Sequence, residues 1–187
     1  MKEYQVKDGE LKLIYELMKN SRRSDRDLAK AIGVSQPTVT RIRNKLEKEG
    51  YISEYTMIPD FTKLGYQILA LTFVKLRKGL DSEEVEKARK IARESLKTNW
   101  YGLIMLERGI GLGCDGVIVS YHKHYACYLE LVNKLKQFTF LDLSKVESFM
   151  ISLNDEVHYA PLSFKVLANH VLTLKEKAKK LKQPKKL

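Results

Sequence analysis

The sequence predicts an α+β protein: an N-terminal winged helix-turn-helix (three helices plus β-wing), then a C-terminal ferredoxin-like β-α-β-β-α-β domain with an added C-terminal helix. Three patterns predict this fold class. Apolar residues recur at helical spacing up to about residue 50, β-branched runs alternate with helical stripes after Gly65, and a heptad-like repeat follows Pro161. We expect domains at residues 1–57 and 66–160, a linker at 58–65, and a C-terminal amphipathic helix and basic tail at 161–187.

The first two helices are predicted from their ends and their apolar faces. Ser24 and Asp27 form a capping box for the second helix. Gly33 can take the left-handed conformation that ends it. The expected apolar faces carry Leu11, Ile14, Tyr15, Leu17 and Met18 in the first helix, and Leu28, Ala31 and Ile32 in the second.

The third helix is expected from Ser35, its N-cap, to about Glu49. Pro37 falls in the first turn, where a missing N–H costs nothing. Gly50 ends the helix, and residues 51–57 are predicted to form the short β-wing.

The C-terminal domain is predicted as four strands and two helices. The strands are expected at residues 66–76, 101–107, 116–121 and 146–153, with a glycine-rich loop at 107–116. Asp81 and Glu84 form a capping box for the first helix. The second helix places five apolar residues on one stripe: Tyr125, Tyr128, Leu129, Val132 and Leu135. Two helices cover one face of such a sheet, so we expect a second subunit to bury the other.

The last helix is predicted from apolar residues that recur at steps of three and four after Pro161. We interpret them as an amphipathic helix packing on its own domain in preference to a coiled coil. The residues are Phe164, Leu167, Val171, Leu174, Ala178 and Leu181.

The net charge of +11 is unevenly spread. Residues 171–187 hold seven Lys/Arg against one Asp/Glu, whereas residues 1–60 hold twelve against ten. The excess is therefore largely a property of the tail, for which phosphate contacts and a solvated end both stay open. Residues 20–48 hold eight basic against three acidic residues, a better local signal for a polyanionic partner.

Composition also excludes several classes of protein. Two cysteines, Cys114 and Cys127, cannot form a disulfide framework or a Cys-rich zinc site. The polar N-terminus has no signal-peptide pattern, and no apolar run approaches the roughly 18 residues of a membrane span. We expect a cytoplasmic protein with no membrane partner, no metal and no cofactor.

The third helix carries the candidate functional face. At helical spacing, Val39, Ile42 and Leu46 cluster on one side, and a polar side lies opposite them. Such short amides, hydroxyls and a guanidinium can pair with base edges in the major groove of DNA. The candidates for base contact on or beside this polar side are Gln36, Thr40, Arg41 and Asn44, with Pro37 beside them.

Other side chains suit the phosphate backbone. Ser35 and Thr38 lie near the free N–H groups of the helix N-terminus. We expect phosphate neutralisation by Arg22, Arg23, Arg43 and Lys45. A solvated face on a structural three-helix bundle would explain the apolar positions, but not the polar tip at the tight Gly-Val-Ser-Gln-Pro-Thr turn. The sequence therefore predicts a partner of double-stranded DNA.

The chain resembles the Lrp/AsnC family of transcription regulators. The resemblance lies in DLAKAIGVSQPTVTRIRNKLEKEGYI, the linker IPDFTKLGY and the β-α-β-β-α-β order, over about residues 9–155. It implies a regulator that binds pseudo-palindromic operators. It also implies a dimer through the C-terminal sheets, extended to tetramers or octamers, and a small effector such as an amino acid.

The effector site implied by the resemblance lies between the second and third strands. In the family this turn carries a glycine-then-aspartate motif, and the matching residues here are Gly111, Gly113, Asp115 and Gly116. A glycine-rich hairpin turn is also what backbone geometry alone demands, so both interpretations stay open.

Two other functions would also account for parts of this sequence. Some proteins of this architecture decarboxylate sirohaem-type tetrapyrroles, which would recruit His122, His124 or His158. His122 and His124 alternate at a strand end and could share a metal, although a surface or partly buried pair is the simpler interpretation. A lone ligand-sensing module would not need the first 60 residues. The sequence therefore favours a regulator that is not an enzyme.

Overall fold

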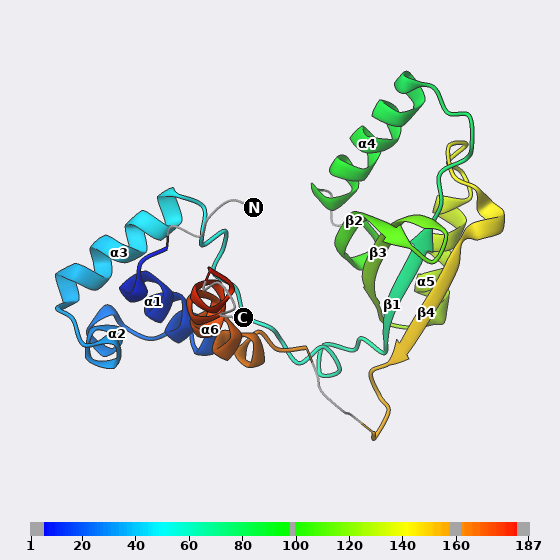
Figure 1. Cartoon of the computed structure of the whole chain (residues 1–187). Coiled ribbons are helices and arrows are strands. Elements are labelled where there is room, and N and C mark those ends of the chain that lie inside the picture. The colour runs from blue at the N-terminus through cyan, green and yellow to red at the C-terminus, as the bar shows by residue number, and fades with distance from the viewer. Residues whose placement is uncertain (1–5, 98–99, 158–161, 183–187) are drawn as a thin grey trace, which may run out of the picture. The chain divides into compact units, whose positions relative to one another are not determined.

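The computed structural model describes residues 6–97, 100–157 and 162–182. They divide into two compact units (Figure 1). The first combines the chain up to Ile58 with the C-terminal helix, and the second runs from Pro59 through the last strand. The positions His158 and Pro161, the predicted boundary at 160/161 and the basic end at 183–187 lie outside the described residues.

Three helices form most of the first unit: α1 (Asp8–Lys19), α2 (Asp25–Ile32) and α3 (Gln36–Lys48). Ser24 is the predicted N-cap of α2, because its Oγ accepts the Asp27 N–H at 3.2 Å. Gly33 ends α2 with φ 75°, the left-handed conformation that glycine adopts without steric cost. Leu28, Val39 and Leu46 are fully buried where the three helices meet.

The predicted apolar faces of the first two helices need correction. Leu13, left out of the predicted face of α1, is fully buried in the common core with Leu17. On α2 the third core residue is Ala29, and Ala31 is exposed. The error on α1 arises because this helix carries apolar residues on more than one side, so helical spacing alone does not select the side that packs.

The predicted β-wing does not form. Within the described part of the chain, residues 51–60 contain no strand. A strand needs a hydrogen-bonded neighbour, and this segment has none. Tyr55 from the segment instead donates a hydrogen bond to Glu47 Oε1 on α3 at 2.8 Å.

The C-terminal helix α6 (Lys165–Lys182) packs against α1, in the N-terminal unit (Figure 1). The prediction that it packs on the C-terminal domain is therefore wrong. Ala168 is fully buried, whereas Phe164 and Leu167 from the predicted seam are 54% and 49% exposed. Leu11 of α1 is buried outside the three-helix core, so α1 has a second packed side.

The second unit has the predicted β-α-β-β-α-β order. Its strands are β1 (Ile68–Val74), β2 (Leu103–Gly111), β3 (Cys114–His122) and β4 (Glu147–Ser152). They form one antiparallel sheet in the order β2-β3-β1-β4. The helices are α4 (Ser82–Lys97) and α5 (Tyr125–Leu135), with short 3₁₀ turns η1 (Trp100–Gly102) and η2 (Leu143–Lys145). The ferredoxin-like prediction is confirmed.

Helix α5 closes one face of the sheet. Tyr128, Leu131 and Leu135 are its buried residues, whereas Tyr125 and Leu129 of the predicted stripe are 54% and 39% exposed. The predicted stripe is therefore rotated from the real one. It missed Leu131, which is fully buried in the core of this unit.

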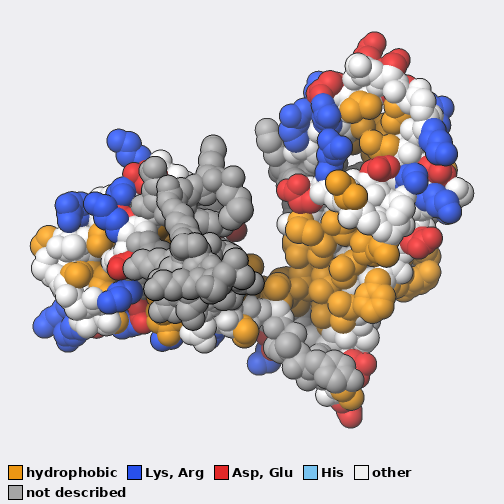
Figure 2. Space-filling view, in the orientation of Figure 1, with side chains coloured by type: hydrophobic (Ala, Val, Ile, Leu, Met, Phe, Trp, Pro, Cys, Tyr) orange, Lys and Arg blue, Asp and Glu red, His pale blue; other side chains and the backbone are white. Residues whose placement is uncertain are grey.

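The opposite face of the sheet is apolar and open, and it forms the large hydrophobic area in Figure 2. The ladder aligns Leu71 with Val119 and Phe149, and Leu69 with Tyr121 and Ile151. Phe149 is 64% exposed. At one end of this face, Phe61 stacks on Tyr121 with ring centroids 3.8 Å apart. Part of the expected linker at 58–65 thus packs on the sheet.

The expected glycine-rich loop at 107–116 is a tight hairpin. Strands β2 and β3 stay paired up to Gly111 and Cys114, which leaves a turn of Leu112 and Gly113. Both turn residues have positive φ, 52° and 69°, as a two-residue turn between twisted strands requires. Gly109, Gly111 and Gly116 therefore lie within the strands, where the sequence suggested a loop.

Candidate nucleic-acid interface

The predicted polar residues gather on one exposed face of α3. Gln36, Pro37, Thr40, Arg41 and Asn44 line a shallow surface depression. All five side chains are exposed. Val39 and Leu46 are fully buried on the opposite side, and this burial holds the helix in place and orients the polar face outward.

Hydroxyl groups at the start of α3 already have partners. Thr40 Oγ1 donates to Asp25 Oδ2 at 2.7 Å, and Ser35 Oγ lies 2.8 Å from Thr38 Oγ1. Ser35 is the N-cap residue of α3, although its side chain makes no cap hydrogen bond. Gln36, Arg41 and Asn44 therefore present the groups best placed to reach a partner.

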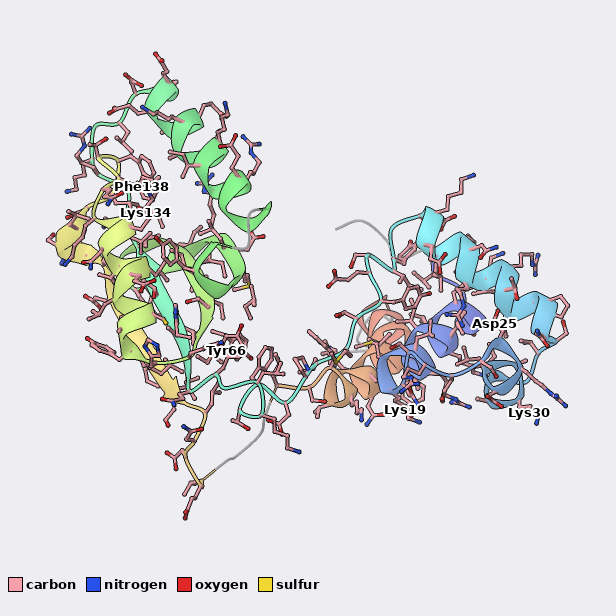
Figure 3. All side chains as sticks on the ribbon, turned by 180° about the vertical axis from the view of Figure 1, so that it is seen from behind. Lys19, Asp25, Lys30, Tyr66, Lys134 and Phe138 are labelled. Atoms are coloured by element: carbon pink, nitrogen blue, oxygen red, sulfur yellow. The ribbon has the colours of Figure 1, made fainter. Side chains whose placement is uncertain are left out.

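Asp25 links α2 to α3. Its carboxylate accepts from Thr40 and pairs with Arg43, which also donates to Tyr55 Oη at 3.3 Å. Figure 3 shows Asp25 on the side of α2 next to α3. Burial alone would raise the pKa of Asp25, but the hydrogen bonds from Thr40 and Arg43 outweigh it and lower the pKa below its ordinary value. The carboxylate stays charged and fixes the angle between the helices.

The basic residues fall into two groups. Arg23 pairs with Glu16, Arg43 with Asp25, and Lys45 with Glu10 at 2.7 Å. These three expected phosphate neutralisers are thus held inside the unit. Arg22 and Arg41 are exposed, and neither forms an ion pair with another described residue.

Three further exposed cations, Arg26, Lys30 and Lys48, lie on α2 and α3 but were not among the predicted site residues. Figure 3 shows Lys30 projecting from α2. A local count of basic residues includes them but cannot rank them, because ion pairing depends on partners far along the chain. Asp25 and Arg43 are eighteen positions apart, and no local sequence signal marks their pairing.

The histidines and cysteines of the second unit have separate structural roles. His122 is buried, and its Nε2 lies 2.8 Å from Ser120 Oγ. His124 is exposed and caps α5 by accepting the Cys127 N–H at 3.4 Å. One ring is therefore buried and the other exposed, each with its own partner in the protein. Within the described residues no cluster of three or more His, Cys, Asp or Glu side chains could hold a metal ion.

The four candidate effector residues lie in two places. Gly111 and Gly113 flank Leu112 at the hairpin tip, where a Cβ would meet open space. Asp115 Oδ2 accepts the Leu76 N–H at 2.9 Å, and Gly116 pairs with Val74 on β1. Asp115 and Gly116 line a cavity beside α4.

Known proteins share both the first unit and the whole fold. A family model described as winged helix-turn-helix DNA-binding matches residues 10–53. An HTH-type transcriptional regulator of Pyrococcus abyssi is 40% identical over 68 residues, 36% of this chain and 45% of that protein. The HTH-type transcriptional regulator LrpC of Bacillus subtilis is 42% identical over 59 residues, 32% of this chain and 41% of LrpC. The chain thus spans less than half the length of these two relatives.

Solved structures extend the likeness over the fold. LrpC of B. subtilis superposes with a TM-score of 0.61 at 20% identity, covering 83% of this chain and 99% of LrpC. A transcriptional regulator of Neisseria meningitidis, solved as its L-Met complex, superposes with a TM-score of 0.67 at 15% identity. The superposition covers 87% of this chain and 99% of the N. meningitidis protein.

The first unit and the exposed polar face of α3 are those of a helix-turn-helix DNA-binding protein. The helix-turn-helix relatives and the solved regulators agree with the predicted resemblance of the chain to the Lrp/AsnC family. The relatives that the chain matches are transcriptional regulators, in agreement with the expectation that this chain is not an enzyme. None of the helices in the described part of the chain is long and apolar enough to cross a bilayer.

Proposed function

We propose that this protein is a sequence-specific DNA-binding transcription regulator that acts in the cytoplasm and places α3 in the major groove. The polar face of α3 carries this proposal. Its three side chains best placed to reach DNA are two amides and one guanidinium, the groups that pair bidentately with adenine and guanine. An ordinary solvated face would not need them together at the exposed N-terminal half of the helix.

Each residue of this face has a distinct role in the proposal. Gln36, Arg41 and Asn44 contact base edges, and Thr40 contributes its methyl group because its hydroxyl is held by Asp25. The first turn, with Ser35, Pro37 and Thr38, approaches a phosphate through backbone N–H groups. Arg22 neutralises phosphates of the DNA backbone directly. Arg23, Arg43 and Lys45 act instead by positioning the helices.

The experiment that tests DNA reading is selection of bound sequences from a random pool, followed by affinity measurements on variants. Arg41→Ala is expected to cost about 1–3 kcal/mol and to relax the preference at one base pair. Lys48→Ala, which removes an exposed cation at the other end of α3, should weaken binding uniformly across sequences. Unchanged sequence preference in Arg41→Ala would rule out this face.

The proposal includes a homodimer formed through the open faces of the two C-terminal sheets. A contiguous apolar face of this size on a soluble chain is a typical subunit interface. A two-fold dimer reads a pseudo-palindrome with half-sites ~34–36 Å apart or a multiple of it. Tetramers or octamers would add further half-sites. The spacing of DNA footprints measures the separation of the half-sites, and light scattering measures the mass of the oligomer.

An amino-acid effector is the last part of the proposal. The N. meningitidis regulator was solved with L-Met. The resemblance to the family implies that Gly111, Gly113, Asp115 and Gly116 form the corresponding site here. Repeating the pool selection with a mixture of amino acids tests it. If an amino acid changes the DNA affinity or the footprint, and Asp115→Asn abolishes this change, the four residues are supported as its site. If no amino acid changes either quantity, the proposed effector site is wrong.

A further inference from the structure

The C-terminal unit contains a cavity of about 510 Å³ between α4 and the α5 side of the sheet. One wall is the apolar side of α4, with Val85, Ala88 and Ala92. These three side chains stay half-buried, whereas Leu131 of α5 is fully buried in the core. Helix α4 thus presents an apolar side that the protein does not fill.

The floor and far wall are also apolar. Leu106 and Ile118 pair across β2 and β3 on the face that α5 covers. Phe138 and Phe140 line the cavity, with rings stacked at a centroid distance of 5.2 Å. The volume falls within the range of about 300–1,000 Å³ for small-molecule sites.

The rim of the cavity is positively charged. Val74, Gly116 and Arg108 form one row across the sheet, so Arg108 projects on the cavity face. Two other guanidinium groups on the rim, those of Arg89 and Arg93, share Glu86. Arg108 forms no ion pair with any residue in the described ranges, so its charge is available to a ligand.

The carboxylates at the rim do not cancel this charge. Asp115 is bound to the Leu76 N–H at 2.9 Å. Glu107 lies opposite Val117 in the ladder between β2 and β3. Because side chains alternate along a strand, the Glu107 side chain points to the opposite face of the sheet from Arg108. An apolar interior with a guanidinium at the mouth is complementary to one ligand type: an apolar body that ends in a carboxylate.

We propose that this cavity binds an amphipathic monocarboxylic acid whose apolar body has about ten carbon atoms. The body lies between α4 and the Phe138–Phe140 pair, and the carboxylate pairs with Arg108. This site shares Asp115 and Gly116 with the proposed amino-acid site but does not include Gly111 and Gly113 at the hairpin tip. The inference does not rest on DNA binding, because it is tested by ligand titration without DNA.

The test is calorimetric titration of the full chain with decanoate, and with decylammonium, which has the same total number of carbon atoms and the opposite charge. Decanoate should bind one molecule per chain, at least about tenfold more tightly than decylammonium. Arg108→Gln should weaken decanoate binding about fivefold to tenfold. Ala88→Phe, which fills the cavity from α4, should abolish it.

Two variants act as controls. Arg77 does not line the cavity, and its guanidinium pairs with Glu84. Arg77→Gln should therefore leave decanoate affinity unchanged. Phe149→Ser alters the open sheet face and should also leave it unchanged, which separates the cavity from that surface. The proposal is overturned if the unmodified chain does not bind decanoate, if decylammonium binds as tightly, or if Ala88→Phe folds and still binds. If Ala88→Phe does not fold, an unchanged affinity in Arg108→Gln overturns it.

Discussion

At the scale of single residues, two arginines two positions apart on α3 have opposite environments. Arg41 is exposed, whereas Arg43 is half-buried between Asp25 and Tyr55. Burial alone would lower the pKa of Arg43, but the hydrogen bonds to Tyr55 and Asp25 outweigh it and raise the pKa. One guanidinium is therefore available to a partner, and the other belongs to the framework.

This contrast predicts different effects on stability. Arg43→Ala should lower the free energy of unfolding by about 1.5–3 kcal/mol, because it leaves the Asp25 carboxylate without its charged partner. Arg41→Ala should change it by no more than about 0.5 kcal/mol. Urea denaturation of both variants measures the difference. Equal stability of the two would contradict the assigned roles.

His122 gives a second residue-scale prediction. Burial lowers its pKa below the ordinary 6.5, so the folded protein keeps the ring neutral at pH values where the unfolded chain takes up a proton. The stability contribution of neutral His122 is therefore complete above pH 6.5 and is lost as the pH falls below it.

The measurement is the free energy of unfolding at several pH values between about 5 and 7.5. His122→Gln, which keeps a partner for Ser120, should remove the His122 part of the pH dependence. His170→Gln, an exposed substitution on α6, should retain it. A pH dependence that is the same in His122→Gln and the unmodified chain would contradict the prediction.

At the scale of elements, α1 is buried on two sides. Leu13 and Leu17 pack into the three-helix core, and Leu11 is buried outside it, in the helix that α6 contacts. Helical spacing showed that α1 is amphipathic but not that two partners share it. The last helix therefore belongs to the N-terminal unit, although almost the whole chain separates it from α1.

The packing of α6 predicts the effect of a buried charge. Ala168→Glu should destabilise the first unit by at least about 2 kcal/mol, because a carboxylate would replace a fully buried methyl group. Val166→Glu, at a position 79% exposed on the same helix, is the matched control and should be near neutral. Thermal unfolding of the two variants measures the difference, and equal melting temperatures would show that α6 does not need this contact.

At the scale of the whole molecule, the open apolar sheet face is the feature that the single chain does not satisfy. Phe149 is 64% exposed there, beside the half-buried Leu71 and Val119. The proposed dimer would bury this face, as standard interfaces bury about 800 Å² on each partner.

Phe149→Lys should therefore convert the proposed dimer to a monomer, because a lysine at the centre of an apolar interface has no partner. Light scattering after size-exclusion chromatography measures the mass. Leu129→Lys, on the outer side of α5, should leave the mass unchanged. A Phe149→Lys protein that keeps the same mass would place the interface elsewhere.

The order of elements, the ferredoxin-like topology and the polar face of α3 were predictable from the sequence, because each depends on a local period or a local cap. Tertiary structure decided the rest. It removed the β-wing, moved α6 to the N-terminal unit and shortened the loop at 107–116 to a two-residue turn. It also divided the basic residues into free and paired groups, since pairs such as Asp25–Arg43 and Glu10–Lys45 join residues eighteen and thirty-five positions apart. Spacing along a chain specifies which residues share a face, but only the folded chain specifies which of them meet.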